Sequence, residues 1–149
     1  EAAGNVKVAR HYIDPQTNKA ITSAVAGQLV KVRLIVTLPE DGFYILVEDQ
    51  LPGGLEALNE GLNTASHEAS AYGYEPAYYW RSYGYNNKEV RGDRVSFFIT
   101  EFGKGTRTFT YYARATRAGE FVAMPVEVWA MYDLSVWGRS ASSELVVGK

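Results

Sequence analysis

The sequence predicts an all-β protein: an antiparallel β-sandwich of about seven or eight strands in a single domain. Hydrophobic and polar residues alternate over several segments, as on strands with one buried face. Clusters of Pro, Gly, Asn and Asp separate these segments, and almost none of the chain has a helical period. With 149 residues the chain is long enough to bury a core, and short turns between strands favour the sandwich.

The first half of the chain contains three predicted strands. Residues 5–13 alternate loosely and end at a turn cluster in residues 14–18, where Pro fixes φ and Asp and Asn favour turns. The segment Leu29–Leu38 follows, with valine or leucine at every second position. The Pro-Glu-Asp-Gly turn at residues 39–42 predicts a hairpin whose second strand covers residues 43–48.

Two segments in the middle of the chain depart from this pattern. Residues 56–71 carry leucines at helical spacing but also glycine and asparagine, so we expect one short helix or an irregular excursion there. Residues 72–87 interleave many aromatic residues with Gly and Ser. This second segment is either a long loop packed with its own rings or a platform for sugars and extended peptides. The platform would be an aromatic binding surface formed by Tyr78, Tyr79, Trp80 and Tyr83.

The second half of the chain contains the remaining predicted strands. Residues 90–102 and 106–116 alternate around Phe97 and around Tyr111, and Gly-Lys-Gly joins them, which predicts a hairpin. Residues 121–129 form a further strand, interrupted at Pro125, which indicates an edge or a bulge. The last predicted strand covers residues 143–147.

The segment of residues 131–140, Met-Tyr-Asp-Leu-Ser-Val-Trp-Gly-Arg-Ser, combines large semi-polar side chains with turn formers. It is too rich in turn formers to be predicted as a plain strand. Because a sandwich core has no need of such a segment, we expect a contact surface there.

Composition argues against several functional classes. The formal net charge is −2 with both signs interspersed, whereas a nucleic-acid-binding surface would carry a basic stripe. The chain has no cysteine and two histidines, and we find no catalytic constellation in it. We therefore predict no metal site, no cofactor and no enzymatic activity.

The start of the sequence and the length of its hydrophobic runs allow two predictions, one about a longer parent chain and one about membrane insertion. The chain begins with Glu-Ala-Ala-Gly-Asn, which is neither an initiator Met nor a signal peptide. We expect residues 1–149 to be one domain excised from a larger multidomain chain. No apolar run reaches the roughly 18 residues that would span a bilayer, so we predict no membrane insertion by this segment.

Three motifs in order resemble those of a known family. Residues 47–56, Val-Glu-Asp-Gln-Leu-Pro-Gly-Gly-Leu-Glu, resemble a "V-x-D-x-L-P-x-G-[LF]-E" passage. Residues 109–121 resemble "F-x-Y-x-x-R-A-x-x-x-G-x-F", and residues 131–140 resemble an "M-Y-x-P-x-x-x-G-R-S" tail in which Leu134 replaces the proline. All three belong to the last macroglobulin-like domain of bacterial α2-macroglobulin-like proteins.

This resemblance implies a non-catalytic domain of a protease inhibitor, a trap with endopeptidase inhibitor activity that serves bacterial defence in the periplasm or cell envelope. Family members rearrange after a protease cleaves them, and many expose a thioester that needs Cys-x-x-Gln in a separate domain. The present domain would dock on that thioester domain and shield it, through Met131, Tyr132, Trp137 and Arg139. Its partners would be other domains of the same polypeptide, and target proteases indirectly.

A second hypothesis comes from a different class of protein. The chain could instead be a stand-alone Ig-like cell-surface module that binds carbohydrate or mediates adhesion, using the aromatic segment of residues 72–85.

Overall fold

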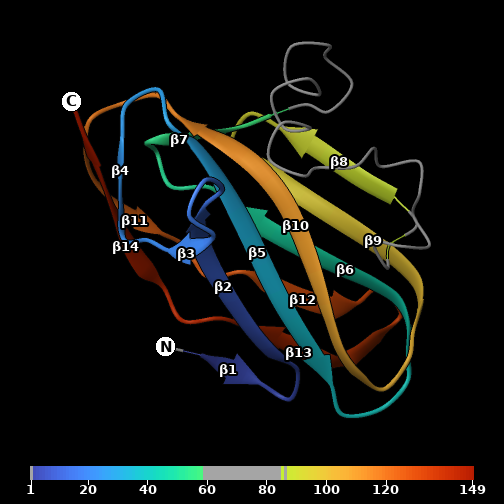
Figure 1. Cartoon of the computed structure of the whole chain (residues 1–149). Coiled ribbons are helices and arrows are strands. Elements are labelled where there is room, and N and C mark those ends of the chain that lie inside the picture. Colours follow the sequence, from blue (N-terminus) through green and yellow to red (C-terminus); the bar gives the residue numbers. More distant parts are fainter. Residues whose placement is uncertain (1, 59–84, 86) are drawn as a thin grey trace.

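A computed structural model describes residues 2–58, 85 and 87–149, and the described part contains strands and no helix. The strands form a sandwich (Figure 1), which confirms the all-β, antiparallel prediction. They divide into fourteen segments, several of two or three residues, so the predicted count of seven or eight corresponds to the longer ones. Of the predicted helical segment of residues 56–71, residues 56 and 57 belong to a strand, and residues 59–71 lie outside the described residues.

The strands are arranged in three sheets. The six-stranded sheet has the order β1-β13-β12-β6-β9-β8, with β1 (Ala3–Gly4), β13 (Asp133–Arg139), β12 (Glu127–Ala130), β6 (Gly42–Gln50), β9 (Arg94–Phe102) and β8 (Asn87–Arg91). The five-stranded sheet has the order β3-β2-β5-β10-β7, with β3 (Lys19–Ala20), β2 (Lys7–Asp14), β5 (Leu29–Leu38), β10 (Gly105–Ala115) and β7 (Leu55–Ala57). The three-stranded sheet has the order β11-β14-β4, with β11 (Gly119–Ala123), β14 (Ser143–Gly148) and β4 (Ser23–Val25). Strand β14 pairs antiparallel with β11 and parallel with β4.

Two predicted hairpins are wrong. Strands β5 and β6 belong to different sheets, and so do β9 and β10: β5 pairs with β2 and β10, whereas β6 pairs with β9 and β12. The two turns therefore carry the chain from one sheet to the other, and they meet where the backbone N–H of Lys104 donates to the Asp41 carboxylate at 2.8 Å. A turn between two alternating segments does not distinguish side-by-side strands from strands that face each other across a core.

The core lies between the six-stranded and five-stranded sheets. Strand β5 buries every second side chain, as its alternation predicts, and those residues are 0–1% exposed. Aromatic rings from the two sheets meet at the centre, where the ring centroids of Phe97 and Phe109 are 5.2 Å apart. Pro125 separates β11 from β12, so the predicted interruption there is the point at which the chain changes sheets.

Candidate functional site

The predicted contact residues Met131 and Tyr132 lie at the tip of a hairpin formed by β12 and β13. Ala130 pairs with Asp133, which leaves Met131 and Tyr132 as the two turn residues. The Tyr132 side chain is 80% exposed and that of Leu134, in the position of the family's proline, is 86% exposed. Most of the segment is strand β13, so the expectation that residues 131–140 are not a plain strand was wrong.

Local polar contacts shape this tip. The Asp133 carboxylate accepts hydrogen bonds from the backbone N–H of Ser135 at 3.1 Å and from its hydroxyl at 2.6 Å. These bonds hold the pKa of Asp133 below its ordinary value, because they favour the charged form. The strand pairing shifts register between Trp129 and Ala130, which places a bulge beside the turn. The tip is therefore a defined conformation rather than a loose loop.

The neighbour of Tyr132 is Tyr44 on β6, which the sequence did not reveal. The two rings meet edge to face, with centroids 5.3 Å apart. The backbone N–H of Met131 donates to the Tyr44 carbonyl oxygen at 2.9 Å. Tyr44 has a φ of 53°, in the left-handed region that residues other than Gly, Asn and Asp rarely adopt.

The predicted residues Trp137 and Arg139 lie further along β13, away from the turn. Trp137 pairs with Trp129 of β12, and Arg139 pairs with Glu127. These residues line a shallow surface groove of about 300 Å³, together with Val128 and Gly138. The predicted set thus divides into a turn, which carries Met131 and Tyr132, and a groove, which carries Trp137 and Arg139.

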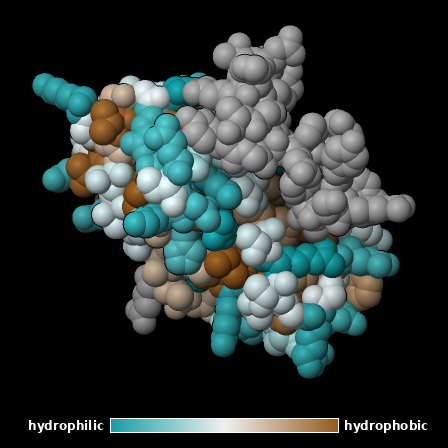
Figure 2. Space-filling view, in the orientation of Figure 1, coloured by the Kyte–Doolittle hydropathy of each residue, from teal (hydrophilic) through white to brown (hydrophobic). Residues whose placement is uncertain are grey.

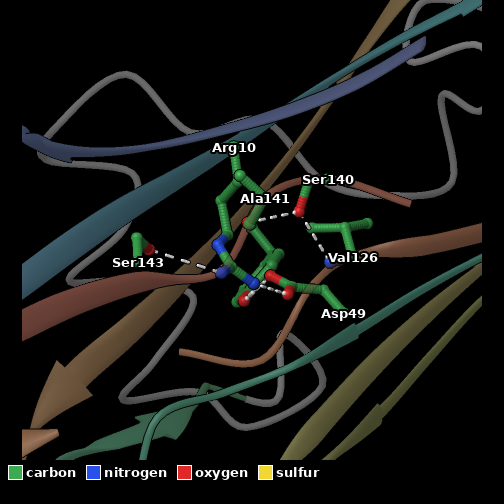
Figure 3. Close-up of polar contacts among 7 residues, drawn as sticks. Arg10, Asp49, Val126, Ser140, Ala141 and Ser143 are labelled. Atoms are coloured by element: carbon green, nitrogen blue, oxygen red, sulfur yellow. Dashed lines mark hydrogen bonds and ion pairs between the residues drawn. The ribbon is translucent and has the colours of Figure 1, made fainter. Parts of the chain in front are cut away.

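Two contacts anchor the end of β13. Gly138 lies against the backbone of Val6, where an added Cβ would come within 2.0 Å of the Val6 carbonyl oxygen, so only glycine fits. Ser140 is 3% exposed, and its hydroxyl accepts from the Val126 N–H at 2.8 Å and donates to the Ala141 carbonyl at 3.0 Å (Figure 3). The Gly and Ser of the tail motif therefore fix the strand that carries the exposed aromatic residues.

A buried charged cluster lies inside the sandwich. Arg10 of β2 donates to Asp49 of β6 at 2.5 Å (Figure 3), and their side chains are 2% and 0% exposed. The Tyr111 hydroxyl of β10 donates to the other Asp49 oxygen at 2.5 Å, and Ser143 of β14 lies 3.5 Å from the Arg10 guanidinium. The cluster joins all three sheets.

Burial governs the ionisation of this cluster. Burial raises the pKa of Asp49, while the Arg10 charge and the Tyr111 hydrogen bond oppose that rise. The pKa of Tyr111 lies well above its ordinary value, first because of burial and then because of the neighbouring Asp49 charge. The tyrosine therefore stays protonated and acts as a hydrogen-bond donor.

The first two sequence motifs meet inside the fold. Asp49 is the acid of the first motif and Tyr111 is the tyrosine of the second, so their hydrogen bond joins the two. Gly54 of the first motif packs under Phe121 of the second, and an added Cβ would come within 2.5 Å of that ring. These positions are explained by packing, and they were missed as a pair because Asp49 and Tyr111 are far apart in sequence.

Three further sequence predictions concern the aromatic platform, a metal site and a membrane span. Tyr78, Tyr79, Trp80 and Tyr83 lie outside the described residues. Within the described part of the chain, no group of three or more His, Asp or Glu side chains could hold a metal ion. The described residues also contain no helix that is long and apolar enough to cross a membrane.

The fold is that of a macroglobulin-type β-sandwich domain, since a solved alpha-2-macroglobulin structure matches it over 99% of the chain. The chain belongs to the family of bacterial alpha-2-macroglobulin MG10 domains, whose sequence model matches residues 6–133. The resemblance inferred from the three motifs is thereby confirmed.

Curated and solved relatives agree with this assignment. The alpha-2-macroglobulin of Thermotoga maritima is 28% identical over 123 residues, which cover 82% of this chain and 8% of the relative. A homologue from Nostoc is also 28% identical and is covered over 6% of its length. Escherichia coli alpha-2-macroglobulin activated by porcine elastase matches 99% of this chain and 13% of its own, with a TM-score of 0.83 and 27% identity. The chain thus spans less than a tenth of the curated relatives it matches.

Proposed function

We propose that this chain is a non-catalytic, C-terminal domain of a bacterial alpha-2-macroglobulin-type protease inhibitor, and that it docks on another domain of the same polypeptide. The docking residues are Met131, Tyr132, Trp137 and Arg139. The observation that carries the proposal is the hairpin tip: Tyr132 is 80% exposed in the turn that leads into β13, a strand that buried Ser140 and the tight Gly138 contact hold in place. A large aromatic side chain held out from an anchored element favours contact with a partner.

The relatives support the identity of the partner. The Escherichia coli protein is described as activated by elastase and by trypsin, and the Salmonella protein as reacted with methylamine. In a parent that responds in this way, the domain contacts the thioester domain where one exists and meets target proteases only through the whole molecule. We place the parent in the bacterial periplasm or cell envelope.

The two methionines of the chain provide a direct test of docking. Met131 is 43% exposed and Met124, between β11 and β12, is 52% exposed, so hydrogen peroxide should oxidise both at similar rates when nothing covers either one. In the full-length parent we expect Met131 to oxidise about tenfold more slowly than Met124, as measured by peptide mass spectrometry. Tyr132→Ala should remove that protection. Equal oxidation of the two methionines in the intact parent would refute docking.

A parent with a Cys-x-x-Gln segment offers a second readout. If Tyr132 shields the thioester, Tyr132→Ala in the full-length protein should speed its reaction with methylamine, and Tyr132→Phe should leave the rate near wild type. An unchanged rate for Tyr132→Ala would remove Tyr132 from the shielding role.

A further inference from the structure

We propose that the contact surface is an aromatic face on the outer side of the six-stranded sheet, built around Tyr44, and that its occupant is an apolar surface of another domain of the same polypeptide. Tyr44 is the positioning residue that presents Tyr132 to this partner. The inference rests on the proposed docking function and extends it from one hairpin to two further strands, β6 and β9, and to the backbone conformation of Tyr44.

The strand register assembles this face from four strands. Trp137 of β13 pairs with Trp129 of β12, Trp129 pairs with Leu46 of β6, and Leu46 pairs with Phe98 of β9. Paired residues lie on the same side of a sheet, and the flanking residues of each strand point into the core, so this row faces outward. Tyr44 lies beside the row, with its ring centroid 6.5 Å from that of Phe98.

Tyr44 interrupts the alternation of β6. Phe43 and Tyr44 are 56% and 44% exposed, whereas Ile45 is fully buried, so two consecutive side chains point outward. The left-handed φ of Tyr44 allows this departure, because it turns the chain without displacing Ile45 from the core. The same residue accepts the Met131 N–H and packs its ring on Tyr132. A strained backbone held at this position points to a role in presenting the tip.

The occupant follows from the composition of the face. Among the described residues, six of the ten exposed large hydrophobic residues belong to β6, to β13 or to the turn before β13: Phe43, Tyr44, Met131, Tyr132, Leu134 and Trp137. The charges at the border of the face are of both signs and partly paired, as in the 3.5 Å contact between Arg94 and Glu48. An apolar centre with a self-compensated border suits a neutral apolar partner rather than a polyanion. This chain covers 8% and 6% of its two curated relatives, so most of each relative's polypeptide lies outside the matched region and provides the sequence for a partner domain.

A smaller apolar area provides a matched control. In Figure 2 hydrophobic residues gather at the edge where β4 and β14 lie, and Val25, Val122 and Val146 are exposed on the three-stranded sheet. None of these valines contributes to the row described above. Val122, which is 61% exposed, is the position at which a substitution should leave the aromatic face unchanged.

The test uses peroxide oxidation of Met131 relative to Met124 in the full-length parent. Tyr44→Asn keeps a residue that tolerates left-handed φ but removes the ring, so we expect the protection of Met131 to fall at least about threefold. Tyr44→Phe retains the ring and should preserve the protection, and so should Val122→Asn. Urea unfolding of each variant checks that the loss is not a general destabilisation.

The outcomes separate this inference from the proposed function. If Tyr132→Ala exposes Met131 and Tyr44→Asn does not, docking stands and the positioning role of Tyr44 is wrong. If Met131 is as reactive as Met124 in the wild-type parent, both proposals fall. If the protection depends on protein concentration, a second copy covers the face, and the intramolecular occupant is overturned.

Discussion

The buried cluster of Arg10, Asp49 and Tyr111 and the aromatic face around Tyr44 are held together by opposite means. In the cluster, charged hydrogen bonds of 2.5 Å join strands from both main sheets, and the Arg10 and Asp49 side chains are at most 2% exposed. On the aromatic face, the Tyr44 ring centroid lies 6.5 Å from that of Phe98 and 5.3 Å from that of Tyr132, and Tyr132 is 80% exposed. In the first arrangement the Asp49 carboxylate is paired with Arg10 and Tyr111, and only the Arg10 Nε lacks a hydrogen-bond partner among the described residues. In the second, the large side chain of Tyr132 is exposed.

This difference separates the residues that stabilise the fold from the residues that we propose for docking. Two of the family motifs, around Asp49 and Tyr111, contribute to the interior, and the tail motif contributes to both regions through buried Ser140 and exposed Tyr132. Substitutions in the cluster should therefore reduce stability, and substitutions on the face should reduce docking. The following predictions test that separation.

The largest effect is expected for Asp49→Ala. Loss of the carboxylate leaves the Arg10 guanidinium buried without its charged partner, so the free energy of unfolding should fall by about 4 kcal/mol in urea titration. Glu48→Ala is the matched control, because Glu48 is the adjacent residue on the outward face and its 3.5 Å contact with Arg94 is partly exposed. A loss below about 1 kcal/mol for Asp49→Ala would mean that the cluster does not hold the sheets together.

A second buried cation tests whether burial of charge is costly elsewhere in the interior. The Lys88 ammonium of β8 lies 5.7 Å from the Phe97 ring centroid, and burial lowers the pKa of Lys88 from 10.5 to about 7. Between these two values the unfolded chain binds more protons than the folded chain, so stability rises with pH. We expect the unfolding free energy of wild type relative to Lys88→Met to rise by about 2 kcal/mol between about pH 7.5 and about pH 9.5. A flat difference would show that Lys88 titrates normally.

A smaller effect is expected for Tyr111→Phe. This change removes one hydrogen bond to a buried carboxylate and should cost about 1.5 kcal/mol in the same urea titration. Tyr12→Phe is the control, since the buried Tyr12 hydroxyl makes no hydrogen bond with the described residues. If both variants cost the same, the hydroxyl of Tyr111 adds nothing to the cluster.

The smallest change in stability is expected for Tyr132→Ala. Tyr132 is 80% exposed and packs edge to face on Tyr44, so the unfolding free energy of residues 1–149 should change by less than about 0.5 kcal/mol. The same substitution should have its large effect on the oxidation of Met131 in the parent. A stability loss comparable with that of Tyr111→Phe would place Tyr132 among the residues that make the fold.

Local sequence predicted the strands better than their partners. The alternation in Leu29–Leu38 and around Phe97 identified which side chains are buried, because a period of two defines a face. The turn after Leu38 did not reveal whether the next strand pairs with β5 or crosses to the opposite sheet. That choice depends on cross-strand packing between residues distant in sequence.

The candidate site could be predicted only in part for the same reason. The density of large side chains in residues 131–140 identified Met131, Tyr132 and Trp137. Trp129 and Phe98 gave no such signal, because their outward orientation becomes a shared face only through the pairing with β6. The left-handed backbone of Tyr44 could not be anticipated, since tyrosine has no preference for that conformation.

The position of β14 between β11 and β4 has a consequence for biosynthesis. Residues 23–25 of β4 are translated well before their partners at Val146–Gly148. Pairing over such a sequence distance is slow, because the intervening chain must first be ordered. Until β14 is translated, the nascent domain lacks the core side chains of Leu145 and Val147, and β4 and β11 lack the strand that pairs with both of them. Ribosome stalling before residue 143 should therefore produce the most aggregation-prone form of this domain.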